Sequence, residues 1–443
     1  MRILNWHTLD ASGRQAALAR PAAAAPTDVN DDVREIIAQV RAHGDAALRR
    51  LTSRYDQVDM DEFAVTGAEL TAARAALAAP ELAALERAIE NVATFHAAQQ
   101  LAPLSLETMP GVRCERLIRP VARVGLYAPA GSAPLPSSVI MLAVPARLAG
   151  CATRVLCTPP DRQGRAHSAI LVAAQLCGVH EIFKIGGAQA IAALAYGTAS
   201  VPKVDKVFGP GNVWVTAAKQ AVAGDPHGAA CDLPAGPSEV LIVADDSAPA
   251  EIIAADLLAQ AEHDPGSQAI LVTASENLAR RVAACVDAQW PALSRGGILQ
   301  QSLLASRCIL VADLPEALAV ANDYAPEHLL LAVREPRQWL NAVESAGSVF
   351  LGPWSPEVLG DYCTGANHVL PTYGYARAYS GLSLIDFVKR ITVQELSAEG
   401  LRALGPTAVT LARLEGLDGH ADSVTRRLQI LARTAAAGAA MAL

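Results

Sequence analysis

The sequence predicts an α/β protein with two Rossmann-like parallel-sheet domains. Short apolar strands alternate with alanine-rich helical segments from about residue 121 to 223, and a second alternation runs from 240 to 351. Such alternation is typical of parallel sheets covered by helices. The chain has 443 residues, enough for two or three domains, and its 52% hydrophobic residues supply ample core material.

The first hundred residues are expected to be mostly helical. Residues that favour helix N-caps begin at Thr27, and apolar residues follow at helical spacing. Alanine-rich stretches continue this pattern to about residue 100. We therefore expect helices here and no sheet.

Four strand–helix units form the first alternation. The expected strands are 121–127, 154–157, 181–185 and 204–208, and the expected helices are 137–150, 167–177, 188–195 and 212–223. The strands expected in the second alternation are 240–244, 269–273, 308–311, 329–333 and 348–351. Beyond Gly381 only short helical pieces with little apolar material follow, so we expect this tail to pack against another surface.

The composition excludes several classes of protein. The chain has 36 Lys and Arg against 44 Asp and Glu, a net charge of -8, and only 4% aromatic residues, which argues against binding to nucleic acid or anionic membranes. No apolar run has the length of a membrane span or signal peptide, so a cytoplasmic protein is expected. The eight cysteines lack CxxC spacing, which favours buried free thiols over disulfides or a thiolate zinc site.

Three glycine-containing turns of the first alternation are candidates for a nucleotide site. They cover residues 127–132, 186–189 and 209–212, each directly after an expected strand. Parallel sheets bind ligands at the carboxyl ends of their strands, and glycine lets the backbone approach a phosphate. Since no GxGxxG motif is present, ordinary tight turns remain the alternative.

Gln260 and His263 are three residues apart in an amphipathic segment. They project from one helix face and could coordinate one ion together. The alternative is a surface pair or a contact at a helix end.

Glu327 and His328 stand side by side before an apolar strand. A carboxylate and an imidazole there could share the role of a base, because partial burial tunes both groups toward neutrality. The alternative is a helix-terminal cap beside a hydrogen-bonded histidine.

Two further segments carry polar groups suited to a site. Asp361 and His368 lie in a loop after the last expected strand, and Glu415 and His420 lie on a turn before the final helix. Each could be structural when taken alone. An amide, two imidazoles and a carboxylate together suit Zn²⁺, and they would come from Gln260, His263, Asp361 and His420.

At these residues the sequence resembles the histidinol dehydrogenase family, over roughly residues 30–435. The stretches that carry the resemblance are GLYAPAGSAPLPSSV (125–139), FGPGN (208–212), DLPAGPSEVL (232–241), QAEH (260–263), APEH (325–328) and NHVLPT (367–372). One departure is Ala130, where a glycine is expected, and its methyl group could crowd a bound nucleotide.

The resemblance implies a zinc- and NAD-dependent four-electron oxidation of L-histidinol to L-histidine through L-histidinal, the last steps of histidine biosynthesis. His328 would be the base in both oxidations, and Glu327 would activate water. The four zinc ligands of each subunit would be Gln260, His263, Asp361 and His420, which with both bases also face the substrate. The other implied contacts are Ser238, His368 and Glu415 for substrate and Tyr127, Gln189 and Asn212 for NAD.

The resemblance also implies a homodimer in which the helical tail, 382–443, reaches the partner's site. We divide the rest of the chain into an N-terminal helical segment (1–26), an NAD-contacting Rossmann-like domain (121–237) and an α/β body (27–120 and 238–381). That body would carry the metal and catalytic residues.

Three alternatives stay open. A paralogue could oxidise another amino alcohol, although His368 and Glu415 favour an imidazole substrate. A zinc-binding homologue could lack turnover, although the presence of both Glu327 and His328 argues against this. A thiohemiacetal route through Cys363 is the chemical rival, but no basic partner for this thiol is evident.

Overall fold

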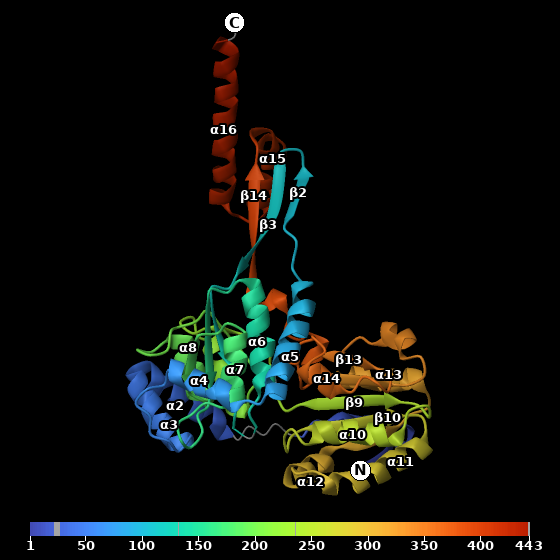
Figure 1. The fold of residues 1–443 in the computed structure, drawn as a ribbon. Coiled ribbons are helices and arrows are strands. Elements are labelled where there is room, and N and C mark those ends of the chain that lie inside the picture. The colour runs from blue at the N-terminus through green and yellow to red at the C-terminus, as the bar shows by residue number, and fades with distance from the viewer. Residues whose placement is uncertain (22–26, 132, 235, 442–443) are drawn as a thin grey trace. The chain divides into compact units, whose positions relative to one another are not determined.

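The computed structural model describes residues 1–21, 27–131, 133–234 and 236–441 (Figure 1). The chain divides into two compact units. The first contains residues 1–99 and 121–387, and the second contains residues 100–120 and the chain from Val388 onward. Two parallel sheets lie in the first unit and an antiparallel sheet in the second, so the predicted α/β class is confirmed.

A five-stranded parallel sheet forms the first predicted alternation. Its order is β6-β5-β4-β7-β8, with β4 (Arg123–Tyr127), β5 (Thr153–Thr158), β6 (Glu181–Lys184), β7 (Lys206–Phe208) and β8 (Ala230–Cys231). The connecting helices are α6 (Pro136–Ala149), α7 (Ser168–Leu176), α8 (Gly187–Tyr196) and α9 (Val213–Ala223). All four predicted strand–helix units are confirmed, and only the short β8 is an addition.

The N-terminal helices cover this five-stranded sheet. On one face, α2 (Thr27–His43) and α3 (Asp45–Tyr55) share a buried core with α8 and α9. On the other face, α4 (Gly67–Ala76) and α5 (Ala79–Ala97) contribute to the core around α6 and α7. We grouped residues 27–120 with the 238–381 body, and this grouping was wrong for the helices. A parallel sheet needs apolar cover on both faces, which these helices supply.

The second parallel sheet has six strands in the order β1-β11-β10-β9-β12-β13. The strands are β1 (Arg2–Asn5), β9 (Glu239–Ala244), β10 (Gln268–Thr273), β11 (Arg307–Leu310), β12 (His328–Ala332) and β13 (Ser348–Leu351). All residues of β9 and β10 are buried, as is usual for central parallel strands. Five of the six strands were predicted.

Helices cover both faces of the six-stranded sheet. One core contains residues of α10 (Ala250–Ala261), α11 (Glu276–Gln289) and α12 (Gly296–Ala305). The opposite core contains residues of α1 (Ala11–Leu18) and α13 (Leu314–Tyr324). The short helix α14 (Glu357–Tyr362) follows β13.

The chain start was predicted as helical, but it adds a strand to this sheet. β1 pairs with β11, and its Ile3 and Leu4 pack against opposite cores. The predicted helical segment 1–26 was therefore wrong at its start. Its described part contains one α-helix, α1, and a short 3₁₀-helix at Trp6–Thr8, whereas residues 22–26 lie outside the described residues. Alternation of apolar side chains to both faces explains why this short stretch forms a strand.

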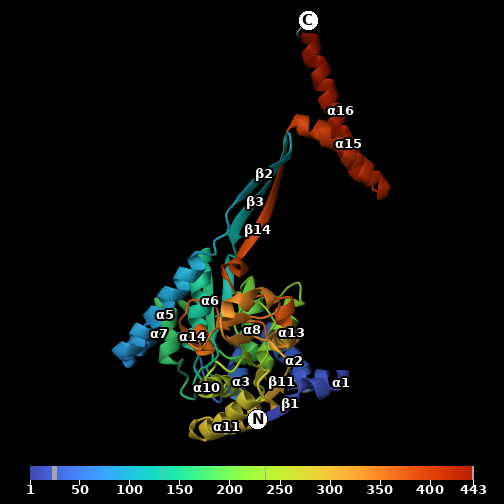
Figure 2. The same cartoon turned by 90° about the vertical axis from the view of Figure 1, so that its right-hand side faces the viewer.

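The second unit contains an antiparallel sheet and two helices (Figure 2). The sheet order is β14-β3-β2, from β2 (Leu104–Met109), β3 (Val112–Pro120) and β14 (Val388–Leu396). The helices are α15 (Ala398–Leu414) and α16 (Asp418–Met441), which pack against each other. The tail predicted as helical (382–443) thus contains a strand, because residues 388–396 pair with β3 along its whole length.

Two further expectations concern cysteines and membranes. All eight cysteines are free thiols, and Cys151, Cys157, Cys177 and Cys308 are buried. No helix in the described part of the chain combines the length and hydropathy of a membrane span.

Candidate active site

The predicted bases lie where α13 gives way to β12. Ala325 ends α13 in the left-handed conformation, at φ 52°, and this turn leads Glu327 and His328 into the start of the strand. Glu327 is 5% exposed and His328 is 3% exposed. Both are thus held in the protein interior and not on a solvated helix cap.

The backbone of Glu239, the first residue of β9, contacts both groups. Its N–H donates to Glu327 Oε2 at 2.8 Å, and its carbonyl oxygen lies 3.1 Å from His328 Nδ1. A carbonyl only accepts, so Nδ1 carries the proton in this contact and the neutral ring has its lone pair on Nε2. That nitrogen lies 3.4 Å from Asp361 Oδ1.

Burial and neighbouring charges shift the pKa values of the two groups. Burial raises the pKa of Glu327 well above the ordinary carboxyl range. For His328 burial acts to lower the pKa, but the carboxylates of Glu327 and Asp361 outweigh burial and raise it. Perturbed groups of this kind are typical of acid–base sites.

The residues predicted as zinc ligands converge in part. His263 lies just beyond the end of α10, with Nε2 3.9 Å from Asp361 Oδ2. Gln260, on the last turn of α10, is fully buried, and neither its amide oxygen nor its nitrogen has a hydrogen-bond partner. The first unit therefore brings His263 and Asp361 together, with an unpartnered amide one helical turn away.

This donor set fits a divalent cation. A buried amide without a hydrogen-bond partner is costly, and a cation coordinated by the amide oxygen would reduce that cost. An imidazole, a carboxylate and an amide oxygen are suitable for zinc. Among the described residues, no three His, Cys, Asp or Glu side chains form a metal-type cluster by themselves.

Two carboxylates near these residues were not predicted. Glu357 lies one turn before Asp361 on α14, fully buried, and neither of its carboxylate oxygens has a hydrogen-bond partner. Asp256 lies one turn before Gln260 on α10, and burial raises its pKa to about 6. Their i, i+4 spacing to predicted ligands was the available signal. The excess of carboxylates is a second feature that suits a cation.

His368 connects this region with the five-stranded-sheet domain. Its Nδ1 lies 2.7 Å from the carbonyl oxygen of Asp361, and its Nε2 lies 3.4 Å from Ser138 Oγ on α6. Burial lowers the pKa of His368. Ser238, the other predicted substrate contact here, is half-buried directly before β9. Since β9 and β12 are parallel, Ser238 and the bases share the amino edge of the six-stranded sheet.

The predicted NAD contacts gather at the carboxyl ends of β4, β6 and β7. The hydroxyl of Tyr127 accepts a hydrogen bond from the N–H of Gly187 at 3.0 Å. Gln189 is buried, with Nε2 3.5 Å from Asp56 Oδ2. Burial raises the pKa of Asp56 to about 6, and this carboxylate was not predicted. It follows α3, far from any strand–turn motif in sequence.

Asn212 caps helix α9 behind the third turn. Its side-chain oxygen accepts hydrogen bonds from the N–H groups of Trp214 and Val215, at 3.1 and 3.2 Å. The side chain is exposed, so it remains accessible while it caps the helix. A capped, exposed helix N-terminus suits an anionic group of a nucleotide.

A buried ion pair holds the start of this turn. Lys219 and Asp232 contact each other, and their side chains are 10% and 1% exposed. Lys219 Nζ donates to the carbonyl of Gly209, and the N–H of Gly209 donates to Asp232, both at 2.8 Å. Gly209 has φ 128°, and a Cβ there would lie 2.2 Å from the carbonyl oxygen of Tyr127. Only glycine fits this position.

Ala130 packs against the core around α6. It is not among the described residues with positive φ, so its methyl group imposes no backbone strain.

Cys363, the rival nucleophile, packs against the core around α6 as well. This apolar contact does not favour formation of the nucleophilic thiolate.

Glu415 and His420 belong to the second unit. Glu415 follows α15, His420 lies in the first turns of α16, and both side chains are exposed. They are therefore free to contact another surface.

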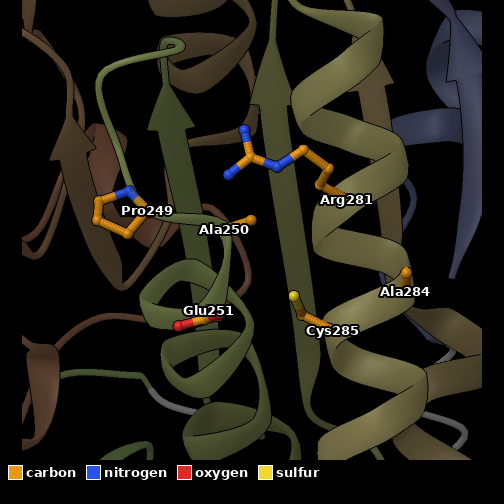
Figure 3. A pocket seen from close by; sticks show the side chains of 6 residues that line it. All are labelled: Pro249, Ala250, Glu251, Arg281, Ala284 and Cys285. Atoms are coloured by element: carbon orange, nitrogen blue, oxygen red, sulfur yellow. The ribbon is translucent and has the colours of Figure 1, made fainter.

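The surface cavity shown in Figure 3 lies away from the predicted residues. It measures about 370 Å³ and lies between the start of α10 and α11. Its lining consists of Pro249, Ala250, Glu251, Arg281, Ala284 and Cys285. None of these was predicted as a site residue.

Comparisons with known proteins agree over nearly the whole chain. The family model for histidinol dehydrogenase matches residues 19–428. Histidinol dehydrogenase of Xanthomonas euvesicatoria pv. vesicatoria is 54% identical over 433 residues, 98% of this chain and 100% of that protein. The corresponding protein of Vibrio parahaemolyticus is 52% identical over 97% of this chain and 99% of its own length. A crystal structure of histidinol dehydrogenase from Elizabethkingia anophelis matches with a TM-score of 0.93 and 42% identity, covering 97% of this chain and 98% of that one.

Proposed function

Because this chain belongs to the histidinol dehydrogenase family and is an oxidoreductase, we propose that it oxidises L-histidinol to L-histidine through L-histidinal, with zinc and NAD. The observation that carries the residue roles is the buried Glu327–His328 pair, held by one peptide backbone beside Asp361. A base and a second titratable group at one point are what two successive oxidations of one carbon require.

His328 is the base for both oxidations in this proposal. Its Nδ1–H is engaged by the Glu239 carbonyl, so Nε2 is the nitrogen that accepts a proton from the substrate oxygen. Asp361, 3.4 Å from Nε2, stabilises the imidazolium that results. Loss of this base would slow both steps.

Glu327 activates water for the second oxidation. An aldehyde has no hydroxyl proton to lose, so it must be hydrated before a second hydride can leave. Burial raises the pKa of Glu327, which makes its carboxylate a stronger base than an exposed one. One of its oxygens is held by the Glu239 N–H, and this fixes the direction of the other.

Gln260, His263 and Asp361 would hold Zn²⁺ together with His420 from a second copy of the chain. Bound zinc would hold the imidazole and amino nitrogens of the substrate and so fix the reacting carbon. His368, Ser238 and Glu415 would complete the substrate contacts. NAD, held by Tyr127, Gln189 and Asn212, would accept the hydride in each oxidation.

The second unit supports a homodimer with an exchanged tail. Its large apolar side chains are widely exposed in the single chain: Leu104, Leu106, Ile391, Leu396, Leu411, Leu414, Leu417 and Ile430. Such a concentration marks an interaction surface. Glu415 and His420 lie among these residues in sequence and are exposed as well, so a second copy that covers the surface would also receive two polar groups.

The decisive experiment is NADH formation from L-histidinol before and after metal removal. We expect a chelator to abolish activity and added Zn²⁺ to restore it. Full activity in rigorously metal-free protein would overturn the zinc assignment. Faster oxidation of another amino alcohol would overturn the assignment of L-histidinol as the substrate.

A pair of histidine variants separates the metal site from the substrate site. His263→Asn should lower the bound metal, whereas His368→Asn should keep the metal and raise KM for L-histidinol. Metal analysis of both proteins decides this. Equal metal loss in the two variants would show that His368 is misassigned.

A further inference from the structure

Glu239 connects the proposed bases with the chain start. Its backbone contacts Glu327 and His328 as described, and its carboxylate is 3% exposed. Oε1 accepts hydrogen bonds from Arg20 Nε at 2.5 Å and from the N–H of Tyr373 at 2.8 Å, and Oε2 accepts one from Arg20 Nη2 at 2.9 Å. The carboxylate is thus bound on both oxygens.

Arg20 is itself held in a defined geometry. Its guanidinium stacks over the ring of Tyr324, with the central carbon 4.0 Å from the ring centroid, and Nη2 also donates to the Tyr324 carbonyl at 2.8 Å. The side chain is 14% exposed. A stacked guanidinium that donates two parallel hydrogen bonds fixes a carboxylate in orientation as well as in place.

We propose that Arg20 and Glu239 are positioning residues for the catalytic pair. Their ion pair fixes the first residue of β9, whose peptide groups orient the Glu327 carboxylate and set the tautomer of His328. A shift of Glu239 would therefore move both bases at once. The inference rests on the proposed roles of these bases, and it assigns a function to an N-terminal arginine that contacts neither of them.

The position of Glu239 depends on the positive charge of Arg20. A buried carboxylate is costly unless it is paired, and Glu239 carries its charge next to Glu327. Without Arg20, the Glu239 carboxylate would lose its cationic partner and the hydrogen bonds that hold both of its oxygens. A resulting shift of Glu239 would disturb the backbone contacts that hold Glu327 and His328.

The test compares Arg20→Met with a matched control, Arg307→Met. Arg307 anchors the same N-terminal segment by donating to the carbonyls of Ala16 and Ala19, at 3.0 and 3.3 Å, but it has no bond to Glu239. Misplacement of a catalytic group by about 1 Å can cost about 10²-fold in rate, so Arg20→Met should lower kcat by roughly 10- to 100-fold. KM for NAD should stay unchanged, and Arg307→Met should lower the unfolding temperature without that loss of kcat.

Two further variants test the role of charge and geometry. Arg20→Lys keeps the charge but cannot form the two parallel bonds, so its kcat should lie between wild type and Arg20→Met. Arg20→Met/Glu239→Gln removes both charges, and the glutamine can still accept the Tyr373 N–H. Its kcat should exceed that of Arg20→Met, whereas simple anchoring of the segment predicts no recovery.

His328→Asn and Glu327→Gln, measured alongside, separate this inference from the proposed function. If either variant keeps full turnover, the assigned base is wrong. If both lose activity while folded Arg20→Met stays within about twofold of wild type, the positioning role is refuted. Equal loss of kcat in Arg20→Met and Arg307→Met, or a double variant no better than Arg20→Met, would also refute it.

Discussion

Replacing Lys219 by Met should destabilise the five-stranded-sheet domain and weaken the NAD binding proposed for it. The change leaves the Asp232 carboxylate, 1% exposed, without its cationic partner and removes the hydrogen bond to the Gly209 carbonyl. Breaking one side of a buried ion pair typically costs about 3–5 kcal/mol. For a domain of this size that corresponds to a fall of roughly 6 to 20 °C in the midpoint of its unfolding transition.

Among the kinetic constants, the change should affect mainly KM for NAD. Gly209 begins the turn that ends at Asn212, so a loosened Gly209 should raise KM for NAD by about tenfold, equivalent to about 1.4 kcal/mol of binding. KM for L-histidinol should change little. Initial rates at varied NAD and varied L-histidinol measure the two constants separately.

Lys203→Met is the matched control. Lys203 Nζ donates one exposed hydrogen bond to the His227 carbonyl at 2.8 Å, so its loss should cost about 1 kcal/mol or less. Lys219→Met/Asp232→Asn should recover part of the stability, since no buried charge stays unpaired. The reasoning fails if Lys219→Met is as stable as Lys203→Met, or if it raises both KM values equally.

Glu327→Gln should slow the oxidation of histidinal more than that of histidinol, by the ~10²–10⁴ usual for a lost base, because only the second oxidation needs activated water. Assays that start from each substrate test this, and equal slowing of both would contradict the division of roles. Co-refolded His263→Asn and His420→Asn chains should regain roughly a quarter of wild-type activity, because half the dimers are mixed and one of their two sites is intact. Demonstrated mixed dimers without activity would exclude the exchanged tail. Burial raises the pKa of Asp56 from 3.8 to about 6, so the folded state binds this proton more tightly than the unfolded state. Stability should therefore fall as pH rises between these values, and Asp56→Asn should be more stable than wild type at neutral pH but not below about pH 4, as urea denaturation would show.

Local patterns account for most of what the sequence predicts correctly. The central strands β9 and β10 of the six-stranded sheet contain continuous apolar runs, and this pattern does not depend on distant residues. The turn after β7 carries its own signal, because two glycines and a proline follow the apolar strand directly in FGPGN (208–212). Such features can be located from a few neighbouring residues.

Features that depend on distant partners were missed. No strands were predicted in residues 104–120, where β2 and β3 form a hairpin, and β3 becomes the middle strand of a sheet because Val388–Leu396 pairs with its other edge. Arg20 and Glu239 are 219 residues apart, and neither stands out in its own segment. Glu357 was missed because an unpartnered carboxylate is recognisable only after burial is known. The exchanged tail stays a prediction, since it concerns a second chain.

The order in which the ribosome delivers β3 and β14 has a consequence for synthesis of the protein. β3 is the middle strand of its sheet, yet its partner β14 is translated roughly 270 residues later. At a translation rate of ~5–20 residues per second, the β3 edge of the β2–β3 hairpin stays unpaired for about 15 to 50 s until β14 has been synthesised. An uncovered edge can pair with another nascent chain, and charged side chains oppose such pairing. The nine residues of β3 include Arg113, Glu115, Arg116 and Arg119. These charged side chains oppose pairing of β3 with another nascent chain until β14 has been synthesised.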